Sequence, residues 1–109
     1  MQHSMITTAF TIDRYRITKD LGVVKGITVR SLSMGGMFKG GLQMIGGGHL
    51  KIFTELCEKA RAEAFDLMIK HAEELGANAI IGVRYDTTPI NEIASEVLCY
   101  GTAVMAEPA

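Results

Sequence analysis

The feature that most limits how this chain can fold is a run of apolar residues with helical spacing in its middle, between residues 50 and 75. Steps of three and four residues place side chains on one face of an α-helix. The residues that follow this spacing are Phe53, Leu56, Cys57, Ala60, Ala64, Leu67, Met68, Ala72 and Leu75. Gly76 comes next, and glycine readily adopts the left-handed conformation that ends a helix. We therefore predict one long amphipathic helix that ends before Gly76.

The apolar arc of this helix is broad. On a wheel of 100° per residue it runs from Leu67 through Met68 to Phe65 and Ile69, roughly half of the circumference. Composition points the same way, because 48% of the 109 residues are hydrophobic and only 21% are charged. Large apolar surfaces usually mark interaction sites, so we expect part of the arc to pack on the chain's own sheet and the rest to face an identical subunit.

Three strands are expected around the helix. Apolar and polar residues alternate from Tyr15 to Val29, which indicates a half-buried strand; Gly26 is interpreted as a hairpin turn or, preferably, a bulge within one long strand. Residues 78–85 and 97–105 are almost continuously apolar, as in strands covered on both faces, and 86–95 with Pro89 is read as the loop between them. The fold class is thus α+β, in the order β-α-β-β, with residues 1–109 as one domain and 1–4 disordered.

Charge and composition exclude several classes of function. The net charge is −1, so no broad positive field would attract nucleic acid, and the apolar runs fall short of the roughly 20 residues of a membrane helix. A cytoplasmic protein is expected by default. Cys57 and Cys99 lie far apart without a C-x-x-C pattern, which favours two buried, reduced thiols.

A glycine-rich but apolar loop, residues 35–48, leads into the predicted helix. Its last glycines, Gly46, Gly47 and Gly48, stand with His49 where free amide groups at a helix start can hold an anion. Neither the P-loop nor the dinucleotide-binding pattern is present, however. A hinge or a close contact between subunits is the favoured use of these glycines.

Arg61 and His49 are the remaining candidate site residues. Arg61 falls within the apolar arc, so it should have a partner: a ligand carboxylate or phosphate, or, as favoured here, a glutamate across a subunit interface. His49 is the best single metal candidate; His3, His71 and the two cysteines show no diagnostic ligand spacing. No catalytic constellation is found, and a non-enzymatic protein is expected.

Several segments, taken in order, resemble the YbjQ family of small prokaryotic proteins. They are Leu21-Gly22-Val23-Val24 with Gly26, Gly47-Gly48, Ala60-Arg61, Leu75-Gly76-Ala77-Asn78-Ala79-Ile80-Ile81-Gly82 and Gly101-Thr102-Ala103-Val104. The resemblance implies a β-α-β-β subunit assembled as a ring, a homopentamer, with a family label of heavy-metal binding. Two departures put a ligand site at the loop in doubt: Met34-Gly35-Gly36-Met37 replaces aromatic and charged residues, and His49-Leu50 stands where arginine and serine are usual.

Three hypotheses of function follow. The first is an oligomeric, non-enzymatic binding module that takes a heavy or transition metal at or near subunit interfaces. The second is a structural or protein-interaction assembly without a small-molecule ligand. The third is storage of an anionic or flat cofactor between subunits.

Overall fold

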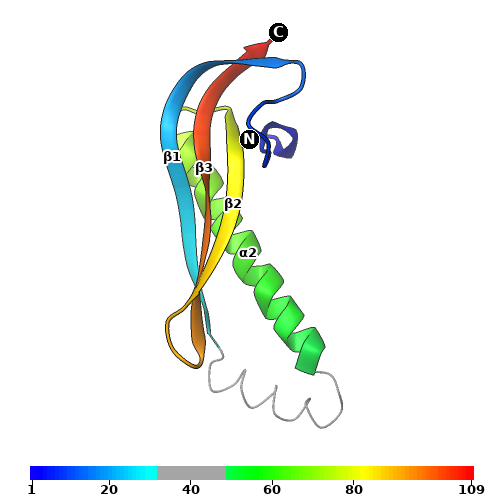
Figure 1. Cartoon of the computed structure of the whole chain (residues 1–109), viewed down its shortest axis with the longest axis vertical. Helices are drawn as coiled ribbons and strands as arrows, with labels where there is room; N and C mark the ends of the chain where they lie inside the picture. The colour runs from blue at the N-terminus through cyan, green and yellow to red at the C-terminus, as the bar shows by residue number, and fades with distance from the viewer. Residues whose placement is uncertain (32–48) are drawn as a thin grey trace.

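The computed structural model describes residues 1–31 and 49–109, with only the backbone at 49 and 50. The elements are η1 (His3–Met5), β1 (Tyr15–Ser31), α2 (His49–Glu74), β2 (Ala79–Pro89) and β3 (Ala94–Pro108). The three strands form an antiparallel sheet in the order β1-β3-β2, and α2 runs along one face of it (Figure 1). The predicted α+β class and β-α-β-β order are confirmed. The short η1 turn was not predicted, and the glycine-rich loop, residues 35–48, lies outside the described residues.

The molecule is long and thin. Its principal extents are 56 × 23 × 17 Å and its Cα radius of gyration is 17.2 Å, whereas a compact domain of this length would have about 13 Å. The long strands and the long helix account for this shape. An elongated body buries less of its apolar surface within one subunit than a sphere would.

Helix α2 ends as the sequence predicts. Gly76 has a φ of 82°, and its amide donates to the carbonyl of Glu73 at 3.0 Å while the amide of Ala77 donates to that of Ala72 at 3.0 Å. The sheet-facing stripe of the helix is Ala60, Ala64, Met68 and Ala72, all buried. Three of these four side chains are alanine, so the helix can lie close to the strands.

Gly26 does not form the expected bulge or turn. The pairing of β1 with β3 is regular from Val23 to Ser31, and the irregularities lie earlier, between Ile17 and Lys19 and between Asp20 and Gly22. A Cβ atom on Gly26 would overlap the carbonyl oxygen of Ala64, so this glycine lets β1 approach α2. Alternation along one strand could not distinguish close packing from a bulge.

The predicted loop at 86–95 is mostly strand. β2 continues to Pro89 and β3 begins at Ala94, because Thr87 and Thr88 pair across the sheet with Val97 and Glu96. Proline is tolerated at the end of an edge strand, where its missing N–H leaves no ladder bond unmade. Only residues 90–93 connect the two strands.

A second small core lies on the sheet face opposite α2. Its buried residues are Met5, Ile12, Ala79, Val104 and Ala106. The N-terminal segment covers them and hydrogen-bonds to β2: Thr7 donates to Ile80 at 3.0 Å, and Val83 donates back to Thr7 at 3.0 Å. The α-amino group of Met1, in the segment expected to be disordered, pairs with Glu73 at 2.8 Å. Part of β2 and β3 is therefore covered on both faces, as predicted, whereas Arg84 to Pro89 is exposed.

Candidate functional site

The glycines predicted to form a site, Gly46, Gly47 and Gly48, lie outside the described residues. His49 is the first residue of α2, and its side chain is likewise not described. The roles predicted for these four residues therefore stay predictions.

Arg61 lies on the exposed side of α2, halfway along the helix. Its guanidinium carbon is 5.4 Å from the centre of the Tyr85 ring, a cation–π arrangement between helix and sheet. In the structure, therefore, Arg61 contacts an aromatic ring of its own subunit. The predicted ligand anion or intersubunit glutamate stays a prediction.

Tyr85 connects Arg61 to a buried thiol. Cys99 is fully buried, its Sγ lies 3.7 Å from Sδ of Met68, and it is the cross-strand partner of Tyr85 in the pairing of β2 with β3. Burial raises the pKa of Tyr85 to about 12, which the nearby charge of Arg61 does not reverse, and it raises the pKa of Cys99 as well. Both groups are protonated at neutral pH. The cluster is therefore built for packing rather than for nucleophilic attack or thiolate ligation.

The other candidate metal ligands are dispersed. His3 packs edge-on against Phe65, with ring centres 5.4 Å apart, and His71 Nδ1 accepts a hydrogen bond from the Lys25 amide at 3.2 Å. Among the side chains that the structure describes, in residues 1–31 and 51–109, no three of His, Cys, Asp or Glu are grouped so that they could hold a metal ion. Both cysteines are free; Cys99 is buried as expected, whereas Cys57 is only half-buried.

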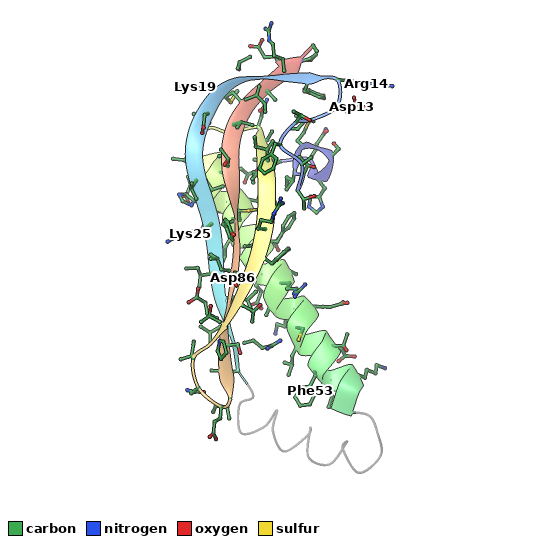
Figure 2. The ribbon with its side chains drawn as sticks, in the orientation of Figure 1. Asp13, Arg14, Lys19, Lys25, Phe53 and Asp86 are labelled. Atoms are coloured by element: carbon green, nitrogen blue, oxygen red, sulfur yellow. The ribbon has the colours of Figure 1, made fainter. Side chains whose placement is uncertain are left out.

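Cys57 is accessible because it lines a pocket that the sequence did not indicate. Toward its N-terminal end α2 diverges from the sheet (Figure 1), and Phe53 stands on this part of the helix (Figure 2). A pocket of about 250 Å³ lies between this part of α2, the end of β1 and the β2–β3 hairpin. Its lining residues are Arg30, Phe53, Leu56, Cys57, Glu92, Ile93, Ala94 and Ser95.

Arg30 supplies the positive charge of this pocket. It is half-buried, and its Nη1 donates to Sγ of Cys57. Val24, Gly26 and Thr28 share its parity along β1, and alternate residues of a strand point to the same face. The sequence signals for this pocket were the position of Arg30 on the helix-facing side of β1 and a cysteine on the apolar arc of the helix. To pair Arg30 with Cys57, however, one must know where the helix crosses the strand.

The comparisons with known proteins agree over almost the whole chain. A YbjQ family model, described as "Putative heavy-metal-binding", matches residues 4–107. The chain belongs to the YbjQ family. A UPF0145 protein of Chromobacterium violaceum is 56% identical over 104 residues, covering 95% of this chain and 89% of the relative. One from Solibacter usitatus is 51% identical over 107 residues, covering 98% and 96%.

One solved structure is also similar to this chain. It is the crystal structure of a protein of unknown function from Pediococcus pentosaceus, assigned to the DUF74 family. It has a TM-score of 0.53 and 24% identity, and the match covers 97% of this chain and 100% of that one. This likeness supports the fold alone. Among the helical residues that the structure describes, no helix has both the length and the apolarity to cross a membrane.

Proposed function

We propose that this YbjQ-family chain is a non-enzymatic binding module that assembles into a homo-oligomeric ring, a pentamer, and binds a heavy or transition metal ion at or near subunit interfaces. One observation carries the assembly. On the sheet face opposite α2, Val23, Ile27 and Val29 of β1 are 70%, 43% and 55% exposed. Apolar side chains in such a row are expected to be covered by another subunit.

The position of β1 strengthens this argument. β1 is an edge strand of 17 residues, and a long, exposed edge is a template for pairing with another chain. By register, Leu98 lies beside Ile27 and Tyr100 beside Lys25, so the apolar surface continues from the edge onto the central strand. A second copy would cover both the edge and this face.

The metal part of the proposal is supported by the description of the family and by the donors of this chain. His49 at the start of α2 is a nitrogen donor of the kind that zinc and copper prefer. A ligand set from one subunit does not emerge among the described residues, which is why we assign the ion to the neighbourhood of an interface.

Native mass spectrometry of protein purified without chelator tests both parts. We expect a ring of identical subunits, with stoichiometric metal after addition of zinc, copper or nickel, and loss of metal in His49→Ala. Ile27→Lys combined with Val29→Lys should shift the ring toward monomer, whereas Thr11→Lys, on the exposed N-terminal segment, should not. A metal-free ring would favour a purely structural assembly. A wild-type monomer would refute the proposal.

A further inference from the structure

We infer that the pocket between α2, β1 and the β2–β3 hairpin binds a small organic anion with an apolar body, anchored by the guanidinium of Arg30. This site is separate from the open sheet face and from His49, so it goes beyond the function proposed above. Its evidence is the combination of a cavity, a guanidinium whose charge is not balanced by any carboxylate in the salt bridges among the described residues, and apolar walls.

The size of the cavity limits the ligand. Its volume of about 250 Å³ is just below the range of about 300–1,000 Å³ that is typical for drug-sized ligands. A monocarboxylate with a short aliphatic chain or one ring fits this volume.

The charge inside the cavity selects an anion. Arg30 carries five N–H donors in a planar fork. Its Nη1 donates to the thiol of Cys57, and a neutral thiol does not balance the charge of the guanidinium. The remaining donors can bind both oxygens of one carboxylate. A soft metal ion is disfavoured here, because the guanidinium already occupies the thiol of Cys57 and would repel a second cation.

The residues that line the pocket favour a ligand with an apolar body and a single negative charge. Phe53 and Leu56 from α2 face Ile93 and Ala94 from the hairpin. Among the described residues that line the pocket, Glu92 is the only acidic one, and it is exposed at the hairpin. Its carboxylate would repel a dianion such as phosphate more than a monoanion, so a monocarboxylate is the favoured class.

Cys57 provides a reporter inside the pocket. In alkylation by iodoacetate or iodoacetamide, the thiolate sulfur attacks the carbon that carries iodine, a C–S bond forms, iodide leaves, and the thiol proton goes to solvent. The two reagents differ in charge but hardly in size. Relative to free cysteine, we expect the iodoacetate-to-iodoacetamide rate ratio at Cys57 to be about tenfold higher, because a hydrogen bond to a charged group favours the anionic reagent. Fully buried Cys99 should react slowly with both and serves as an internal blank.

The variants separate charge from shape. Arg30→Met, which keeps the length but not the charge, should abolish the preference for iodoacetate, and Arg30→Lys should retain most of it. Glu92→Gln should increase it. Circular dichroism and thermal melting show whether each variant is folded, and the comparison of the two reagents on the wild-type protein needs no variant.

Binding itself is measured by two-dimensional ¹H–¹⁵N NMR with benzoate, and with benzamide as the neutral control. EDTA is present throughout, so that the result is independent of any metal site. We expect saturable shifts at Arg30, Cys57, Ala94 and Ser95 with benzoate, weak or no shifts with benzamide, and protection of Cys57 from iodoacetate by benzoate. Equal responses to both probes, shifts confined to other residues, or an unchanged alkylation ratio in Arg30→Met would overturn the inference.

Discussion

Gly26 of β1 and Ala64 of α2 meet backbone to backbone. A Cβ atom added to Gly26 would overlap the carbonyl oxygen of Ala64 and would lie 2.5 Å from the amide nitrogen of Met68. Both neighbours are main-chain atoms of a regular helix, which cannot rotate away. The separation between helix and sheet is therefore set at this point.

Replacing Gly26 with alanine should destabilise the fold. Overpacking a well-packed core costs about 1–3 kcal/mol, and the upper end is expected because the clash is with backbone. Urea unfolding monitored by circular dichroism measures the change. The control is Lys19→Ala at an exposed position of the same strand, which should alter the unfolding free energy by less than about 0.5 kcal/mol. Equal effects of both substitutions would show that the contact does not limit the packing.

The side chain of Asn78 forms a paired bridge to the backbone of Ala106. Nδ2 donates to the carbonyl oxygen at 2.9 Å, and Oδ1 accepts from the amide at 2.8 Å. Asn78→Ala would leave two polar groups of a buried residue without these partners, a cost of about 1–3 kcal/mol. Thermal unfolding should reveal this loss. Glu107→Ala, which breaks an exposed ion pair with Arg16, is the matched control and should be nearly neutral.

Alkaline pH should weaken the fold through Tyr85 and Cys99. The pKa of Tyr85 is raised from 10.0 to about 12 and that of Cys99 is raised above 9.0, so the unfolded chain releases both protons first as pH rises. The contribution of Tyr85 is complete below pH 10 and is lost as pH rises toward 12.

Urea titrations at about pH 8, 10 and 11 should thus give a falling unfolding free energy. Tyr85→Phe should flatten the fall above pH 10 but leave the part due to Cys99. If the slope in the variant matches that of the wild type, Tyr85 titrates normally and the assignment is incorrect.

His71 caps one amide of the β1 edge. Its Nδ1 accepts from Lys25 at 3.2 Å, so this amide, which points away from β3, has a partner on the helix. His71→Ala removes the acceptor and should accelerate hydrogen exchange at the Lys25 amide by about fivefold, corresponding to a net hydrogen-bond contribution of roughly 1 kcal/mol. Exchange at Cys99, in the central strand, should stay unchanged. Lys70→Ala, adjacent on an exposed part of the helix, is the control.

The helix and the covered strands could be predicted because their signals lie within short stretches of sequence. The helical period of the apolar residues and Gly76 after it define α2, since a left-handed residue ends the helix whatever surrounds it. The hydrophobic runs near Ile80 and Val104 likewise indicated covered strands. These conclusions depend on neighbours in the sequence only.

The candidate site could not be predicted in the same way. The pocket requires Arg30, Cys57 and Glu92 to converge from three elements, and their convergence depends on the angle at which α2 leaves the sheet. Gly26 illustrates the same limit: its role follows from Ala64, which is far away in the sequence.

The amino-acid sequence by itself determined the α+β class, the order of the elements and the end of the helix, because these follow from spacing and from the conformational freedom of single residues. The tertiary structure alone decided which strand lies at the centre of the sheet, that the N-terminal segment covers its second face, and that Arg30 meets Cys57 beside a pocket. Contacts between distant segments set these features, and a pattern along one segment carries no information about the partner it will pack against.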